Sequence, residues 1–203
     1  FSYPEYREMS PMLYFNYQEA LETVGNVDLQ PTDITNYDLR WEWFPGAGEF
    51  IAVSGFYKHF ENPVELRIRN QSSNNRAEFV NAASALLWGF EWELRAGLER
   101  LHERLQPFQV IANFTWIYSE VDGARKRAMQ GQSPYLLNTI LFFEPFEGKT
   151  QMSLLYNKFG RRISKVGVDN FPDVYEESRE SLEFSWTQTL ASGLKAKFTA
   201  RNL

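Results

Sequence analysis

Cysteine is absent from this sequence of 203 residues, and histidine occurs only twice. The absence of cysteine excludes a disulfide scaffold and a cysteine-based zinc site. His59 and His102 each stand alone, without a partner at metal-binding spacing, so no metal site and no cofactor are predicted. Basic residues are also in the minority, with 21 Lys and Arg against 26 Asp and Glu. This acidic balance argues against a nucleic-acid partner, which needs a basic face.

Long hydrophobic runs are missing as well. No stretch reaches the ~18 to 20 apolar residues of a membrane-spanning helix, and the first residues, FSYPEYREMSP, lack the basic and apolar segments of a signal peptide. The lack of long apolar runs does not exclude a membrane β-barrel, because barrel strands alternate apolar with polar residues and keep the mean hydropathy low. Catalytic motifs are not found either: GQSPY, for example, lacks the second glycine of a nucleophile elbow. The sequence therefore predicts a protein that is not an enzyme.

Aromatic residues, in contrast, are abundant: 6 Trp, 10 Tyr and 17 Phe. Many of them alternate with polar residues, which is the period of a β-strand. Along residues 85–94, for example, Trp88, Phe90 and Trp92 share one face, and Glu91 and Glu93 share the other. We predict an all-β protein with about eight long antiparallel strands. Clear alternation marks 37–43, 85–94, 108–118, 181–190 and 194–201, and three weaker candidates are 49–60, 133–144 and 150–159.

The connections between these strands fall into two groups that alternate along the chain. Short turns are expected at 45–48, 145–149 and 191–193, and longer polar connections at 61–82, 122–132 and 160–177. An up-and-down sheet would place the short turns at one end and the long connections at the other, as in outer-membrane barrels. The exception is 96–107, whose helical spacing predicts one or two amphipathic turns.

The two faces of the predicted strands prefer different solvents. All six tryptophans lie on apolar faces, where a lipid headgroup region would supply a partner for each indole N–H. The opposite face carries Asp38, Arg40, Glu42 and other charges, for which the filled interior of an eight-stranded barrel has little room. The pattern favours an arc of a wider membrane barrel, with a soluble sandwich or lipocalin-like barrel as the alternative. The predicted lipid-facing residues are Trp41, Trp43, Trp88, Phe90, Trp92, Phe114, Trp116, Phe184 and Trp186.

Several motifs occur in an order that resembles the C-terminal part of the barrel in TonB-dependent receptors of the bacterial outer membrane. They are PEYREMSP (4–11), the segment 24–65 with RWEWFPGAGEF at its centre, ASALLWGFEWELRAGL (83–98), QGQSPYLLNTILFF (130–143), SLLYNKFGRRISKVG (153–167) and PDVYEESRESLEFSW (172–186). Together they span nearly the whole chain.

The resemblance implies an antiparallel, up-and-down transmembrane β-barrel of 22 strands, of which residues 1–203 would form about eight. It implies a receptor of the outer membrane that takes up a siderophore, haem, cobalamin or glycan, powered by TonB through a plug domain. The expected partners are therefore outer-membrane lipid and lipopolysaccharide, TonB, and a small-molecule or metal-chelate ligand. Nothing in residues 1–203 resembles the plug, a TonB box or the terminal strands. A passive porin-like channel and a soluble β-sandwich binding module are the alternatives.

Candidate ligand-binding residues lie in the expected extracellular loops. Tyr14, Phe15 and Tyr17 would form a rigid aromatic platform, with packing between loops as the alternative. Arg125, Lys126 and Arg127 could hold lipopolysaccharide phosphates or an anionic ligand, because guanidinium groups bind phosphate in a bidentate manner; the alternative is a solvated loop. Arg161 and Arg162 are further candidates, for which the resemblance also suggests a structural role where a loop begins.

Overall fold

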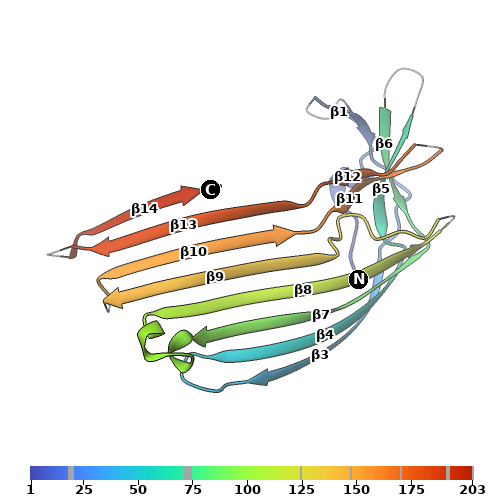
Figure 1. Cartoon of the computed structure of the whole chain (residues 1–203). Coiled ribbons are helices and arrows are strands. Elements are labelled where there is room, and N and C mark those ends of the chain that lie inside the picture. The colour runs from blue at the N-terminus through green and yellow to red at the C-terminus, as the bar shows by residue number, and fades with distance from the viewer. Residues whose placement is uncertain are drawn as a thin grey trace.

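The computed structural model describes residues 1–17, 21–70, 75–123, 125–146, 148–169, 171–190 and 193–202. Its strands form two sheets, one of eight strands and one of six (Figure 1). Within the described part of the chain, no helix is both long enough and apolar enough to traverse a bilayer.

The large sheet contains one strand for each of the eight predicted strand segments. Its strands follow the chain in spatial order, each antiparallel to the next, so the predicted up-and-down arrangement is confirmed. The sheet is open, with β3 at one edge and β14 at the other, and it curves as an arc (Figure 1). The strands are β3 (Asp33–Trp43), β4 (Phe50–Glu61), β7 (Ser84–Gly97), β8 (Phe108–Asp122), β9 (Tyr135–Phe146), β10 (Thr150–Phe159), β13 (Arg179–Thr189) and β14 (Lys195–Arg201).

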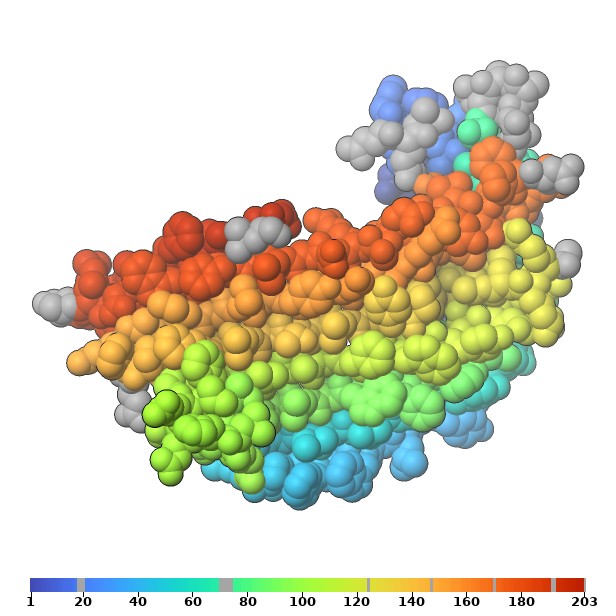
Figure 2. Space-filling model, viewed as in Figure 1, coloured from blue at the N-terminus to red at the C-terminus, as the bar shows by residue number. Residues whose placement is uncertain are grey.

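The short connections lie together at one end of the large sheet, which we call the turn end (Figure 1). Gly48 and Gly193 there adopt φ values of 75° and 79°, which favour glycine because a Cβ would be strained. The predicted amphipathic turns of 96–107 form two 3-10 helices, η1 (Leu98–Arg100) and η2 (Glu103–Leu105). Figure 2 shows one face of the large sheet, and this segment, in lime green, stands out from that face.

The six-stranded sheet at the opposite end differs from the prediction. The segments 61–82 and 160–177 were expected to be polar connections, and residues 12–17 an exposed loop, yet all three contain strands. Two of its pairings are parallel, β2 with β6 and β5 with β11, and join strands distant in sequence. The strands are β1 (Leu13–Asn16), β2 (Leu21–Val24), β5 (Val64–Asn70), β6 (Asn75–Asn81), β11 (Arg162–Gly167) and β12 (Val174–Glu176), preceded by the single helical turn α1 (Tyr6–Met9).

The two clusters of buried hydrophobic residues lie within the six-stranded sheet and at the end of the large sheet next to it. Leu21, Ile68 and Ala77 pack together within the six-stranded sheet. A second cluster, Ala82, Ala85 and Val121, lies where β7 and β8 meet the six-stranded sheet. Among the residues that the structure describes, no second layer covers the apolar side chains in the long middle of the large sheet.

Strand register places all six tryptophans on one face of the large sheet. Trp88 lies opposite Tyr118, Trp92 opposite Phe114, and Trp116 opposite Phe90. The indoles are not sealed between sheets, since each of the six is 36% to 57% exposed. We call this surface the aromatic face; the other side of the sheet, with Arg40, Glu93 and their neighbours, is the polar face.

Candidate functional site

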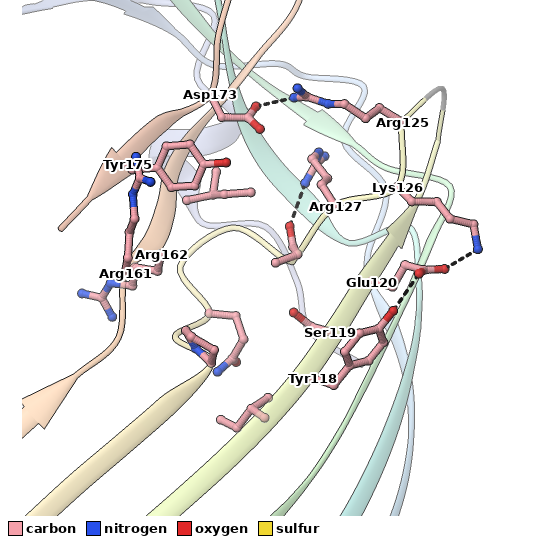
Figure 3. Close-up of a pocket in the computed structure, with 15 residues that line it drawn as sticks. Tyr118, Ser119, Glu120, Arg125, Lys126, Arg127, Arg161, Arg162, Asp173 and Tyr175 are labelled. Carbon is pink, nitrogen blue, oxygen red and sulfur yellow. Dashed lines mark hydrogen bonds and ion pairs between the residues drawn. The ribbon is translucent and has the colours of Figure 1, made fainter. Parts of the chain in front are cut away.

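A cavity of about 570 Å³ lies between the end of β8 and the strands β11 and β12 of the six-stranded sheet (Figure 3). Two connections that are separate in sequence, the one after β8 and the one around β11 and β12, form its walls. The structure thus brings together all five basic residues predicted as ligand contacts: Arg125, Lys126, Arg127, Arg161 and Arg162.

Each of these basic side chains has an acidic partner. Nη2 of Arg125 lies 2.7 Å from Oδ1 of Asp173, and Nζ of Lys126 lies 2.7 Å from Oε1 of Glu120. Because its ammonium donates a hydrogen bond to the Glu120 carboxylate, the pKa of Lys126 is raised above its ordinary value. Two further pairs at the rim are Arg161 with Glu177 at 3.0 Å and Arg162 with Glu176 at 2.7 Å.

Arg127 differs from the other four because its side chain is largely buried. Its Nη2 lies 2.5 Å from Oε2 of Glu65 on β5, and its carbonyl accepts a hydrogen bond from the amide of Val121. Nearby, Gln130 accepts from the amide of Leu66 and donates to the carbonyl of Ser164. These contacts tie the segment after β8 to the six-stranded sheet, so Arg127 holds the cavity wall in place.

Aromatic rings border the cavity on two sides. The guanidinium carbon of Arg161 lies 4.0 Å from the ring centroid of Tyr175, a cation–π contact. The hydroxyl of Tyr118 donates to Oε2 of Glu120 at 2.8 Å, and its ring centroid lies 5.8 Å from that of Trp88. The cavity therefore begins where the aromatic face ends.

The predicted aromatic platform lies in a different place. Tyr14, Phe15 and Tyr17 line a separate hollow of about 530 Å³ next to Arg7 and Leu66. The Arg7 guanidinium lies 4.6 Å from the Tyr14 ring centroid, and the rings of Phe15 and Tyr17 meet edge to face at 5.0 Å. The structure thus keeps these three aromatics together but does not bring them to the basic cavity.

A group of arginines on β5 and β6 was missed by the sequence analysis. Arg69 lies directly opposite Arg76, and Arg67 opposite Glu78, so their side chains share one face. Arg69 also pairs with Glu78. The Nε atoms of Arg67, Arg69 and Arg76 are buried without a hydrogen-bond partner. The alternation in VELRIRN was the available signal, but the neighbouring NQSSNNRAE stretch made the whole segment resemble a loop.

The polar face carries its own ion pairs. Arg40 bonds to Glu93 on β7, to Glu42 at 2.6 Å and to the Ser54 hydroxyl at 3.1 Å. The ion pair with Arg40 thus accounts for the position of the Glu93 carboxylate on this face. Among the residues that the structure describes, no group of three or more histidine or acidic side chains is arranged to hold a metal ion.

At the turn end, the carboxylate of Glu49 connects two turns through an ion pair with Arg100. Glu49 is buried and accepts hydrogen bonds from Nη2 of Arg100 at 2.7 Å and from the amide of Gly97 at 3.2 Å. The hydrogen bond from Arg100 is the main reason that the pKa of Glu49 lies below its ordinary value. The pair joins the β3–β4 turn to η1.

Comparison with known proteins identifies a family model and several solved structures that match this chain. The family model described as "TonB dependent receptor-like, beta-barrel" matches residues 2–197. A search of curated proteins finds no match.

Solved structures with the same fold include three receptors. The siderophore receptor PirA from Pseudomonas aeruginosa matches with TM-score 0.65 and 19% identity over 99% of this chain and 34% of its own. PirA from Acinetobacter baumannii matches with TM-score 0.64 and 14% identity over 90% of this chain and 29% of its own. The ferric-catecholate import receptor Fiu from E. coli K12 matches with TM-score 0.64 and 11% identity over 87% of this chain and 24% of its own.

The chain thus spans about a third or less of the length of these receptors. At such low identities the similarity establishes the fold, and the family model, which covers nearly all of the sequence, establishes the relationship. The chain belongs to the TonB-dependent receptor β-barrel family.

Proposed function

We propose that this chain is the C-terminal portion of the barrel of an outer-membrane receptor that takes up a siderophore-type metal chelate in a TonB-powered cycle. The observation that carries the proposal is the large sheet, which has one aromatic face, one charged face and two open edges. An open sheet edge leaves backbone groups unsatisfied in lipid, so β3 and β14 need further strands of a larger barrel.

The aromatic face would meet the hydrocarbon and interface regions of the outer membrane. Trp41, Trp43, Trp88 and Trp116 are all exposed on it and have no covering layer. Amphipathic rings are favoured at membrane interfaces because they are apolar but carry a hydrogen-bonding group. In a soluble β-sandwich this face would be covered by a second sheet, which argues against that alternative.

The polar face would line the wet interior of the barrel. Arg40, Glu42 and Glu93 form an ion-paired group there that needs water or a polar partner. In the family such an interior encloses the plug, on which TonB acts. The same interior would suit a passive porin-like channel, so the energy dependence of uptake must be measured.

The six-stranded sheet would lie on the extracellular side, together with the candidate ligand contacts. Tyr14, Phe15 and Tyr17 supply aromatic surface, and Arg67, Arg69 and Arg76 supply positive charge for an anionic chelate. The family and the siderophore receptors PirA and Fiu, which share the fold, support this ligand class.

The test is uptake of radioactive iron as a ferric catecholate by cells that produce the full receptor containing this chain. We expect saturable uptake that is lost in a strain without TonB and after the proton gradient is dissipated. Equal uptake with and without TonB would instead identify a passive channel. Recovery of the full protein in the aqueous fraction without detergent would contradict its placement in the membrane.

A further inference from the structure

We propose that Gln130 is a positioning residue for the ligand: its side-chain amide sets the place of the candidate contacts on β1, β5 and β6 relative to the barrel wall. The inference rests on the proposed function, which puts ligand contacts on these strands. It goes further because it names the group that fixes their position without touching the ligand.

The two parts of the six-stranded sheet meet where β5 pairs with β11 (Figure 1). β5 and its neighbours carry the candidate contacts, whereas β11 directly follows the wall strand β10. Among the described residues, the register of β5 with β11 joins two positions, at Arg67 and Ile68, compared with seven for β5 with β6. Few backbone hydrogen bonds therefore hold the two parts together at this point.

The amide of Gln130 lies directly before this short pairing. Its Oε1 accepts a hydrogen bond from the amide of Leu66 on β5 at 2.7 Å. Its Nε2 donates to the carbonyl of Leu66 at 3.2 Å and to the carbonyl of Ser164 on β11 at 2.6 Å. A side-chain amide carries the same kinds of donor and acceptor as a peptide group. Gln130 thus adds one further step to the connection between β5 and β11.

The segment that carries Gln130 is attached to both strands. The amide of Gly131 donates to the carbonyl of Ile163 on β11 at 2.8 Å. Gly131 has a φ of 76°, which favours glycine at this position. On the other side, the side chain of Arg127 pairs with the buried Glu65 on β5. Gln130 lies between these two attachments in sequence, so its side chain has a fixed origin.

Leu66 relates the Gln130 amide to both groups of candidate contacts. The Leu66 side chain lines the same hollow as Tyr14 and Phe15. Side chains alternate along a strand, so Arg67 and Arg69 lie on the opposite face of β5 from Leu66. A displacement of the Leu66 backbone would therefore move the aromatic hollow and the arginines together.

Two substitutions separate hydrogen bonding from charge. Gln130→Glu keeps the shape of the side chain and an acceptor for the Leu66 amide, but an ionised carboxylate cannot donate to the two carbonyl groups. Gln130→Met has similar length, no charge and no amide. The matched control is Gln132→Met, because the Gln132 amide donates to the carbonyl of its neighbour Ser133.

The test measures two properties of the full receptor. Hydrogen exchange in detergent follows the amides of β5 (Val64–Asn70) and β11 (Arg162–Gly167) without any ligand. Uptake of the radioactive ferric catecholate by cells gives the concentration for half-maximal uptake and the maximal rate. The maximal rate is divided by the amount of folded receptor, so that a loss of folded protein is not mistaken for an effect on the ligand.

We expect exchange in both strands to be at least about tenfold faster in the two Gln130 variants, because hydrogen bonds are lost and buried carbonyls lose a donor. The concentration for half-maximal uptake should rise at least about threefold, because the contacts then occupy the binding arrangement for only part of the time. The maximal rate per folded receptor should not change. Gln132→Met should exchange as the wild type does.

Three results would overturn the inference. Exchange equal to that of the wild type would show that the amide does not hold the two strands, and a raised half-maximal concentration with that result would mean that Gln130 contacts the ligand itself. Faster exchange with an unchanged half-maximal concentration would show that the amide stabilises the sheet but does not position the contacts. A fall in the maximal rate alone would likewise indicate a merely structural role.

Failure of the proposed function would have a different signature. It would show as absent or TonB-independent uptake in the wild type, before any variant is compared. Hydrogen exchange needs no ligand, so it would still decide whether Gln130 holds β5 against β11.

Discussion

Glu65 on β5 and Arg127 after β8 form an ion pair in which Oε2 and Nη2 are 2.5 Å apart and the side chains are only 4% and 11% exposed. A second cation, Arg67, also lies near Glu65, but its Nη2 is 3.7 Å from Oε2 of Glu65, which is beyond direct hydrogen-bond distance. The pair joins the connection after β8 to the six-stranded sheet at a point that is largely shielded from water.

Replacing Arg127 by alanine should therefore destabilise the junction strongly. Removing one partner of a buried pair leaves an uncompensated charge and costs about 3 to 5 kcal/mol. Hydrogen exchange of the amides in β5 (Val64–Asn70) of the full receptor would measure the free energy of local opening. Arg161→Ala, which breaks an exposed pair, is the control and should cost at most about 1 kcal/mol. Equal protection in both variants would contradict the structural role of Arg127.

Gly89 on β7 should not tolerate a side chain, whereas Gly55 on β4 should. A Cβ at Gly89 would lie 2.2 Å from the Trp116 carbonyl oxygen and 2.7 Å from the Phe56 ring. At Gly55 the nearest atom, in the Phe90 ring, is 3.6 Å away, which is ordinary contact. We expect Gly89→Ala to cost about 1 to 3 kcal/mol through overpacking, and Gly55→Ala to be nearly neutral. Urea unfolding of the two receptors in detergent tests this, and the prediction is wrong if their midpoints coincide.

Phe90→Lys should interfere with insertion of the receptor into the membrane. Phe90 lies near the middle of β7 on the aromatic face, where a lysine in hydrocarbon costs about 2 to 4 kcal/mol. Asn113→Lys is the matched control, because Asn113 lies on the polar face directly opposite Glu93. The folded fraction in lipid vesicles, read from heat-modifiable migration on gels, should fall for the first variant only. A larger loss for Asn113→Lys would mean that the two faces are assigned the wrong way round.

The contact between Glu49 and Arg100 predicts a loss of stability at acidic pH. Because the folded-state pKa of Glu49 lies below its ordinary value of 4.5, the pair stabilises the fold fully at pH values above 4.5. Its contribution declines as the pH falls below 4.5 and is gone once the pH is below the folded-state pKa. Thermal unfolding of wild type and Glu49→Gln should therefore differ at pH 7 and converge in acid. A difference that is the same at both pH values would contradict this assignment.

The large sheet was accessible from sequence because its determinants are local. Alternation in segments such as 85–94 and 108–118 fixes both the strand and the face of each side chain. Short turns such as 45–48 fix which strands are neighbours. The aromatic and polar faces could therefore be assigned residue by residue, and register confirms that all six tryptophans share one side.

The six-stranded sheet was not accessible in the same way. Its strands are short and polar, and its parallel pairs join Glu22 with Arg76 and Val166 with Arg67 across long stretches of chain. The alternation of apolar and polar residues along a strand carries no information on such pairings, because parallel neighbours are not joined by a tight turn. The alternation within 64–70 was present but was masked by the polar residues that follow it.

Local sequence was enough to predict the strands of the large sheet, their order and the chemistry of its two faces, since each depends on residues a few positions apart. The charged groups that meet, in contrast, are known only from the three-dimensional fold. Arg125 and Asp173 lie in separate connections, and Arg127 lies in a connection far in sequence from Glu65 on β5, yet each pair is in contact. Their meeting depends on how the strands of the six-stranded sheet pair, for example β5 with β11, and these pairings join segments that are far apart in the chain.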